Sequence, residues 1–220
     1  GIHEYRDLGY LPEAMRNYLL RLGWSHGDDE IISTEQAIAW FNLDSIGRSP
    51  SRVDFKKLDN LNGHYMRNTT DEMLADGVLA LLRSKGATVP GNLKASLVSA
   101  MPGLKERAKT LVELADGAYY LMATRPLVLD EKAKKLLTAD ARTVLSGVGQ
   151  ALAATSAWTP AALDAATRAF AEQNGHKLGT VAQPLRAALT GRSTSPGIFD
   201  VLVVLGREEA LARINDQAKG

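Results

Sequence analysis

Polar side chains that could bind an unpaired nucleobase gather near the C-terminal end of the sequence. They are predicted to lie around one corner, where an amphipathic helix over about residues 178–190 ends at Gly191 and a new helix opens at Pro196. Amide and guanidinium groups can hydrogen-bond to base edges, and a guanidinium can also stack on base faces. Helix and turn chemistry is the alternative explanation, because a serine before a helix caps its backbone N–H groups. The groups concerned are those of Gln183, Arg186, Arg192, Ser193, Thr194 and Ser195.

The elements that must position these groups are predicted to be helices. Start signals are a first-turn proline at Pro12, a capping box at Ser33 and a second capping box over Thr69-Thr70-Asp71-Glu72, and a further helix is expected from Asp54 to about Arg67. Further helices are expected between Pro90-Gly91 and Pro102-Gly103, from 104 to about 123, after Asp130, over 138–155, from the start signal Thr159-Pro160 to Asn174-Gly175, and after Gly206. The sequence therefore predicts an all-α fold of about eleven helices, with at most one or two very short strands near the N-terminus.

The spacing of apolar residues predicts which faces of two helices are buried. Apolar residues recur at helical spacing in both, and all of these are expected to face the core. They are Ala14, Tyr18, Leu19 and Leu22 in the first helix, and Met73, Leu74, Val78, Leu81 and Leu82 in the helix after Thr70.

Composition limits the function classes. The chain has 220 residues, 45% hydrophobic content, 6% aromatic content and no cysteine, which suits packed helices and excludes disulfides and thiolate metal sites. We expect a soluble, cytoplasmic protein without a membrane partner, because no apolar run has the roughly 20 residues that cross a bilayer. A net charge of +1 argues against a protein that coats DNA or RNA, so any RNA contact must come from locally basic faces.

Two sets of motifs resemble bacterial glutamyl-tRNA synthetases. The C-terminal set resembles their anticodon-binding domain, and the N-terminal set resembles the segment that follows their class I signature loop. The C-terminal motifs are Gln183-Pro184-Leu185-Arg186, Ala188-Leu189-Thr190-Gly191, Ser195-Pro196, Phe199 and Leu205-Gly206. The N-terminal motifs are Tyr5-Arg6-Asp7-Leu8-Gly9-Tyr10-Leu11-Pro12-Glu13-Ala14, Asn17-Tyr18-Leu19, Leu22-Gly23-Trp24-Ser25 and Phe55-Lys56-Lys57-Leu58.

The resemblance implies a multi-helical anticodon-binding architecture in three parts. These are a stem-contact region over residues 1–67, a first helical anticodon-binding domain over 68–155 and a second over 156–220. The implied partner is tRNA-Glu, with tRNA-Gln as an alternative, and the protein is expected to be monomeric.

Base and backbone contacts follow from the same resemblance. Residues implied at the anticodon are Arg107, Arg168, Gln183, Arg186, Arg192, Ser195, Pro196 and Ile198, and those implied along the tRNA stem are Arg48, Arg52, Lys56 and Lys57. Ordinary surface cations are the alternative for the stem residues and Arg168, and core packing is the alternative for Ile198. Arg107 is expected on a helix with Lys105 and Lys109, near the wobble base. Lys132, Lys134 and Lys135 are interpreted as a solvated helix start.

No catalytic constellation is recognised. The His-Ile-Gly-His motif and the Lys-Met-Ser-Lys-Ser-type loop of class I synthetases do not occur, so the chain is expected to be a fragment of the ligase that cannot activate glutamate alone. No catalytic residue, metal or cofactor is expected in it, while ATP and Mg belong to the full-length enzyme. A helical protein-interaction module without RNA binding is the alternative function, and an independent hydrolase or ligase is a third class.

Overall fold

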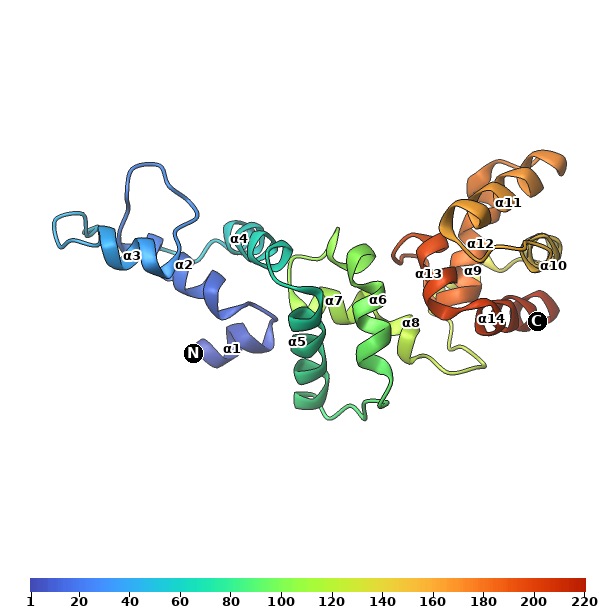
Figure 1. Ribbon diagram of the computed structural model, residues 1–220, viewed down its shortest axis with the longest axis horizontal. Coiled ribbons are helices and arrows are strands. Elements are labelled where there is room, and N and C mark those ends of the chain that lie inside the picture. The colour runs from blue at the N-terminus through green and yellow to red at the C-terminus, as the bar shows by residue number, and fades with distance from the viewer. The chain divides into compact units, whose positions relative to one another are not determined.

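The computed structural model describes all 220 residues and confirms the all-α fold class. About 66% of the residues are helical, in fourteen helices, and the single β-feature is an isolated antiparallel bridge between Trp24 and Ile46. Figure 1 shows the helices in chain order. None of them is long and apolar enough to span a bilayer.

Contacts divide the chain into two compact units. Unit 1 comprises Gly1–Val89 and Lys105–Asp116, and unit 2 comprises Pro90–Leu104 and Gly117–Gly220. The three-part division at residues 67 and 155 stays a prediction.

Unit 1 is held together by two buried asparagines. Asn62 accepts a hydrogen bond from the Leu11 N–H (2.8 Å) and donates to the Lys109 carbonyl (2.6 Å). Asn17 accepts from the Ile32 N–H and the Tyr65 hydroxyl, both at 2.8 Å. Buried amides that satisfy backbone groups in this way hold loops against helices. The helices of this unit are α1 (Ile2–Asp7), α2 (Pro12–Gly23), α3 (Thr34–Trp40), α4 (Phe55–Arg67), α5 (Asp71–Ser84) and most of α7 (Leu111–Gly117).

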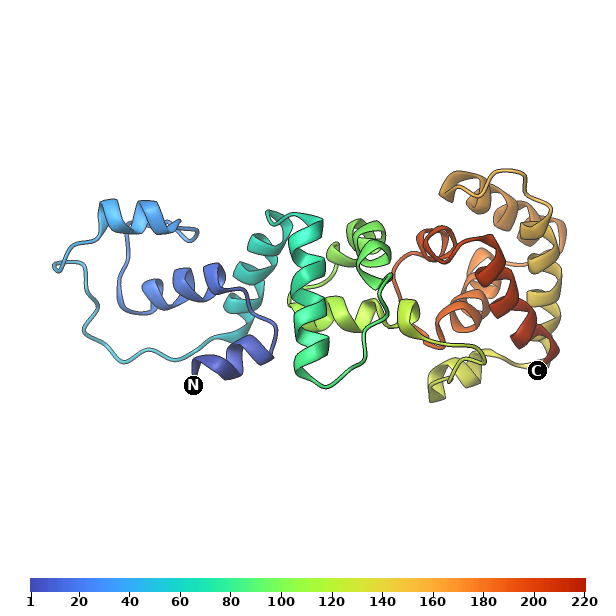
Figure 2. The same cartoon turned by 60° about the horizontal axis from the view of Figure 1, so that its bottom comes forward.

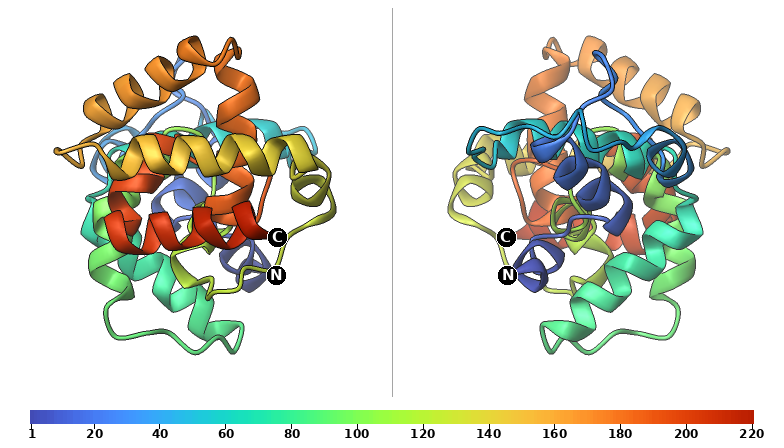
Figure 3. Two further views of the ribbon diagram at one scale, coloured as in Figure 1. Left: turned by 90° about the vertical axis from the view of Figure 1, so that its right-hand side faces the viewer. Right: turned by 90° about the vertical axis from the view of Figure 1, so that its left-hand side faces the viewer.

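Unit 2 encloses a continuous apolar core. In the end view of Figure 3, α10 runs beside α14, and α11, α12 and α13 pack against them. Fully buried leucines on several helices fill the interior, among them Leu145, Leu163, Leu185 and Leu202. The helices are most of α6 (Leu93–Lys105), α8 (Tyr119–Met122), α9 (Glu131–Leu136), α10 (Ala139–Ala153), α11 (Pro160–Gln173), α12 (Leu178–Thr190), α13 (Ile198–Leu205) and α14 (Arg207–Lys219).

Several helix boundaries differ from those predicted. The sequence gives no strong start signal for α1, and the helix predicted from 104 to about 123 is instead α7 and α8, preceded by a non-helical stretch. Pro102 was expected to end the helix but lies inside α6. A proline this close to the C-terminus removes one backbone hydrogen bond, and the last turn still forms. Arg107 therefore lies in a turn after α6 and does not share a helix with Lys105 and Lys109.

Three local predictions were wrong. The predicted capping box on Thr69 does not form, because the Thr69 hydroxyl donates to the Tyr65 carbonyl. Thr70 caps α5 instead, and its hydroxyl accepts from the Met73 N–H at 3.2 Å. Leu19 and Met73 were expected in the core but are 51% and 64% exposed. The buried face of each helix is offset from the predicted apolar stripe. The buried residues are Ala14, Met15, Asn17 and Tyr18 on α2, and Leu74, Ala75, Val78, Leu79 and Leu81 on α5.

Candidate nucleic-acid interface

The corner between α12 and α13 has the predicted helix–loop–helix course. Gly191 ends α12 with φ +72°, and a Cβ there would lie 2.6 Å from the Val128 carbonyl oxygen. A residue other than glycine would meet both a strained backbone and a clash, so the corner requires glycine. The Gly191 carbonyl also accepts a hydrogen bond from the Asp130 N–H at 3.0 Å. These contacts attach the segment before α9 to the end of α12.

Ser195 does not cap α13, contrary to the capping alternative. The helix begins at Ile198 with Gly197 as its N-cap. The Ser195 hydroxyl donates to the Pro196 carbonyl (2.7 Å) and accepts from Nε of Arg186 (3.0 Å). A hydroxyl that is used in this way holds the half-buried Arg186 side chain across the corner. The Arg186 guanidinium is therefore oriented by the corner.

A pocket of about 250 Å³ lies beside this corner. From α12 and the loop after it, Gln183, Arg186 and Ser193 line the pocket. From α9 it is lined by Leu136, Lys132 and Lys135, and the two lysines were predicted to be solvated. Three of the lining side chains are cations and none is a carboxylate. The helical spacing of the two lysines was a signal for a shared face, but their proximity to Arg186 depends on how α9 packs on α12. The structure thus brings Gln183 and Arg186 together and adds Lys132 and Lys135 to them.

Arg192 is exposed, and its guanidinium lies over the ring of Tyr119, 4.4 Å from the centroid. A cation over an aromatic face is stabilised by the ring quadrupole. Tyr119 belongs to α8, so the loop after α12 rests on a helix that lies far earlier in the chain. The sequence offered no signal for this partner.

The other residues implied at the anticodon are placed differently. Arg168 on α11 is exposed, and its Nε donates to Asp164 one turn away at 2.6 Å. It does not line the pocket. Ile198 is 5% exposed and belongs to the core, the half-buried Phe199 packs against that core, and Pro196 is half-buried. A base contact by Ile198 would require this packing to open.

The cations implied along the tRNA stem all lie exposed in unit 1. Asp54 caps α4 by accepting hydrogen bonds from the backbone N–H groups of Lys56 (3.0 Å) and Lys57 (3.2 Å), and this directs both residues into the first turn. Arg48 and Arg52 belong to the loop that precedes this cap, and Arg107 is an exposed turn residue. Their roles, like those of the anticodon residues, stay predictions.

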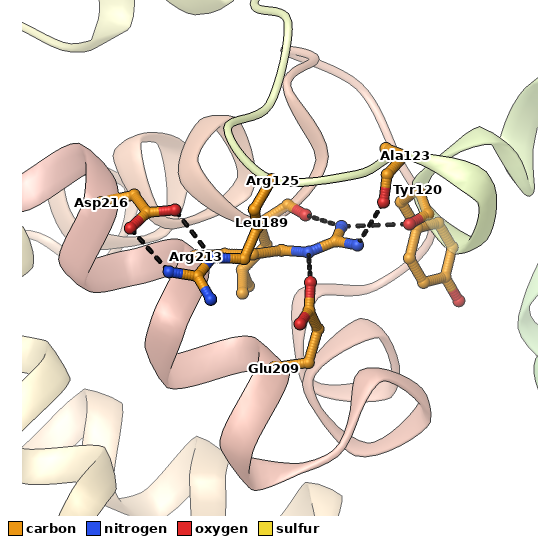
Figure 4. Close-up of polar contacts among 7 residues, drawn as sticks. All are labelled: Tyr120, Ala123, Arg125, Leu189, Glu209, Arg213 and Asp216. Carbon is orange, nitrogen blue, oxygen red and sulfur yellow. Dashed lines mark hydrogen bonds and ion pairs between the residues drawn. The ribbon is translucent and has the colours of Figure 1, made fainter.

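A buried arginine that the sequence analysis missed fixes the end of α12. Arg213 of α14 is 3% exposed; its Nη1 donates to the carbonyls of Leu189 (2.8 Å) and Tyr120 (3.0 Å), and its Nη2 to that of Ala123 (2.9 Å). Its Nε donates to Glu209 at 2.8 Å (Figure 4). The guanidinium therefore ties the last turn of α12, next to Gly191, to α8 and α14. Its place on the buried stripe of α14, beside Ala210 and Ile214, was the available signal.

A second arginine, Arg125, joins the segment after α8 to α14 at the surface. Arg125 donates from Nε (2.7 Å) and Nη2 (2.8 Å) to the two carboxylate oxygens of Asp216, as drawn in Figure 4. This bidentate pairing lowers the pKa of Asp216 and raises the pKa of Arg125. Burial, with a smaller contribution from Asp200, raises the pKa of the nearby Tyr120 hydroxyl. Tyr120 is therefore neutral wherever the protein is folded at ordinary pH.

Comparison with known families places the chain in a recognised class. Residues 71–218 match the family described as "Anticodon binding domain", and residues 1–60 match the family described as "tRNA synthetases class I (E and Q), catalytic domain". The chain belongs to the anticodon-binding domain family. The second match qualifies the expectation that the chain lacks the catalytic domain, because residues 1–60 resemble part of that domain.

Highly similar relatives are glutamate–tRNA ligases. The chain is 59% identical to "Glutamate--tRNA ligase 2" of Parvibaculum lavamentivorans over 99% of its own length and 45% of the relative. It is 59% identical to the ligase of the same name from Rhodospirillum centenum, covering 47% of that protein. The chain thus spans about half the length of these relatives and corresponds to their C-terminal part. This confirms the resemblance drawn from the motifs.

A solved structure has the same fold. The glutamate–tRNA ligase of Elizabethkingia meningosepticum, crystallised with its amino acid, aligns with 98% of this chain and 42% of its own chain, with a TM-score of 0.81 and 27% identity.

Proposed function

We propose that this chain is the tRNA-recognition part of a glutamate–tRNA ligase and that the pocket between α9 and α12 receives an anticodon nucleotide of tRNA-Glu. The observation that carries the proposal is the convergence of Gln183, Arg186, Lys132 and Lys135 on one carboxylate-free pocket. This pocket lies inside the segment that matches the anticodon-binding family. Relatives named as glutamate–tRNA ligases support the choice of RNA.

The chemistry of the pocket suits a base with its phosphate. The amide of Gln183 carries two donors and an acceptor, so it can read the edge of an unpaired base. The guanidinium of Arg186 presents planar donors and can stack on a base face. The two lysines would neutralise the adjacent backbone phosphate, which is the contact that makes RNA binding salt-dependent. The expected binding mode is therefore a base turned toward α12 and a phosphate toward α9.

The remaining contacts extend the same proposal. Arg168, Arg192, Ser195, Pro196 and Ile198 are proposed around the anticodon loop. Arg107 is proposed near the wobble base, where it bears on the choice between tRNA-Glu and tRNA-Gln. The stem is assigned to Arg48, Arg52, Lys56 and Lys57. In the full-length ligase, a cytoplasmic monomer, this part binds and checks the tRNA while ATP and Mg serve glutamate activation elsewhere.

Substitutions on α9 and α12 test the pocket directly. The Arg186→Ala variant is expected to weaken binding of a tRNA-Glu transcript by about 1–3 kcal/mol, or about 5- to 150-fold, in a filter-binding titration at fixed salt. The Lys135→Ala variant is expected to reduce the slope of log affinity against log salt by about 1. Lys134→Ala is the matched control, because Lys134 is the neighbouring residue of α9, does not line the pocket and pairs with Glu131.

Unchanged affinity in the Arg186→Ala variant contradicts the proposed site. Equal affinity of the unsubstituted chain for tRNA-Glu and for an unrelated tRNA contradicts anticodon recognition. No binding to any tRNA at two salt concentrations favours the protein-interaction alternative.

A further inference from the structure

Two arginines of unit 2 lie over aromatic rings, and their N–H donors are used differently. Arg207 lies over Trp158, 4.9 Å from the ring centroid, and its guanidinium donates to three backbone carbonyls at the end of α10. Arg192 lies over Tyr119 at 4.4 Å, but the only hydrogen bonds of Arg192 are made by its backbone. The first pair closes a helix end, whereas the second leaves a guanidinium whose N–H donors have no acceptor in the protein.

A buried network fixes the spacing between Tyr119 and Arg192. Arg213 donates from Nη1 to the carbonyls of Leu189 (2.8 Å) and Tyr120 (3.0 Å), as drawn in Figure 4. Tyr120 directly follows Tyr119, and Leu189 lies three residues before Arg192. One buried guanidinium therefore ties the backbone next to the aromatic ring to the backbone next to the exposed cation.

The loop that carries Arg192 is held by a buried hydroxyl. The Thr190 hydroxyl, in a residue that is 2% exposed, accepts from the Arg192 N–H at 3.2 Å and donates to the Arg186 carbonyl at 2.8 Å. Tyr119 is half-buried at the start of α8, which Figure 2 shows as a short yellow-green helix followed by an extended connection to α9. The ring and the guanidinium are thus positioned by separate buried groups, so a ligand meets them already assembled.

The chemistry of this pair suits an unpaired nucleobase. The plane of a guanidinium stacks on base faces, and an aromatic ring is the other common stacking partner of single-stranded RNA. The charge of Arg192 is attracted by the Tyr119 ring and, on its solvent side, by RNA phosphates. Ser193, the next residue, lines the pocket between α9 and α12. The pair and the pocket are therefore close enough for two nucleotides of one RNA strand.

We propose that Tyr119 and Arg192 form a stacking platform for a second unpaired nucleotide of the tRNA anticodon loop. This rests on the function proposed above, in which the pocket at α12 receives a first nucleotide. Tyr119 is a positioning residue: its ring orients the guanidinium, and the base stacks on the exposed face of Arg192. The competing explanation is a structural clamp like that of Arg207, which would affect stability and not RNA affinity.

Substitutions that keep the charge or the apolar volume test the platform. Arg192→Lys keeps the charge but loses the plane, and Tyr119→Leu keeps an apolar side chain but loses the ring. Each is expected to weaken binding of a tRNA-Glu transcript at least about fivefold in a filter-binding titration, whereas Tyr119→Phe changes it less than about twofold. Tyr119→Leu should leave the slope of log affinity against log salt unchanged, because it removes no charge. Arg207→Lys is the matched control, expected to lower the melting temperature and leave the affinity unchanged.

A coupled measurement locates the stacked base. The tRNA-Glu is assembled with one abasic nucleotide at each unpaired anticodon-loop position in turn, and each tRNA is titrated with the parent chain and with three variants. At one position Arg192→Lys and Tyr119→Leu are expected to lose their effect, because the base that they contact is already absent. At that same position Arg186→Ala should still weaken binding at least about fivefold.

Four outcomes decide between the platform and the pocket. Full affinity of both Tyr119→Leu and Arg192→Lys overturns the platform, while a loss in Arg186→Ala in the same titrations leaves the pocket standing. A loss that persists at every abasic position also overturns it, since the pair then supports the fold or a phosphate. One abasic position that cancels all three substitutions excludes a second nucleotide. Equal affinity of the parent chain for an unrelated tRNA contradicts the proposed function itself. Arg192 is exposed, so Arg192→Lys keeps the test decisive even where Tyr119→Leu does not fold.

Discussion

The helices from α9 to α14 and the N-terminal segment over residues 1–60 have interiors of different kinds. The former surround a continuous core of fully buried leucines, and their one buried arginine is satisfied by three carbonyls and a carboxylate. The latter has a small core around Tyr10, Met15, Tyr18 and Leu58, and its loops are held by the amides of Asn17 and of Asn62, which directly follows the segment. Most of the exposed apolar side chains of the molecule lie there.

The contrast between these two regions shows that the packing beneath a site decides how firmly its side chains are held. The pocket between α9 and α12 stands on a core that is closed by its own helices, so its cations can be held in place without a partner. A groove between α2 and α3, with a volume of about 670 Å³, has a rigid wall on one side and an α-helix without buried residues on the other. Substitutions should therefore act strongly in the first region and weakly in the second.

The largest effect is expected from Arg213, the buried arginine of unit 2. The Arg213→Met variant keeps most of the side-chain volume but leaves two buried carbonyls and one half-buried carbonyl without their donor, and should lower the free energy of unfolding by about 4 kcal/mol. Urea denaturation combined with hydrogen exchange of α12 and α14 measures this loss. Arg168→Met is the control, because an exposed i,i+4 pair contributes only about 0.3–0.5 kcal/mol. A loss below about 1 kcal/mol for Arg213→Met would show that the hydrogen bonds of Arg213 contribute little to the free energy of unfolding.

A smaller effect is expected when one apolar residue is truncated in each region. Leu145→Ala removes a fully buried side chain of α10 and should destabilise the protein by about 3 kcal/mol, through lost transfer energy and a cavity. Ile38→Ala removes an exposed side chain of α3 and should change stability by less than about 0.5 kcal/mol. Both are measured by thermal and urea unfolding of the same chain. Similar losses at the two positions would remove the contrast between the regions.

The smallest of the three predicted changes in stability is expected for two glycines at opposite ends of α12, Gly179 in its first turn and Gly191 at its C-cap. Gly191→Ala, at φ +72° and 2.6 Å from the Val128 carbonyl, should destabilise unit 2 by about 2 kcal/mol and weaken tRNA binding, because the corner must shift. Gly179→Ala, in the first turn of α12 with nothing near its Cβ position, should stabilise it by about 0.5–1 kcal/mol. The two changes in melting temperature should have opposite signs. The same sign for both would contradict the role assigned to the corner.

Much of the fold could be predicted because helix signals are local. Asp54, Asp130 and Thr159 were expected to start helices and do so, and Ser33 forms the expected capping box with Gln36. A cap depends on backbone groups two or three residues away, which the sequence displays directly. The starts of α1 and α8 have no side-chain cap, so no local signal marks them. The start of α7 does have one that the prediction missed, because the Thr110 hydroxyl accepts from the Glu113 N–H at 3.2 Å.

The candidate site was predicted only in part, for the same reason. Gln183 and Arg186 were found from their motif and their place on one helix. Lys132 and Lys135 were interpreted as solvated because nothing in the sequence places α9 against α12. Helix capping was the alternative explanation for Ser195, but in the structure its hydroxyl binds Arg186 and the Pro196 carbonyl and does not cap α13.

The all-α class, most helix starts, the end of α12 at a glycine and the family of the chain could be read from the amino-acid sequence. These features depend on hydrophobic period, on caps and on backbone freedom, which act over a few residues. Packing between distant segments determines which cations share the pocket, that Arg213 is buried, that Met73 is exposed, and that α3 keeps an open groove. Those outcomes depend on contacts between residues far apart in the chain, such as Arg213 with Tyr120, and local pattern carries no information about them.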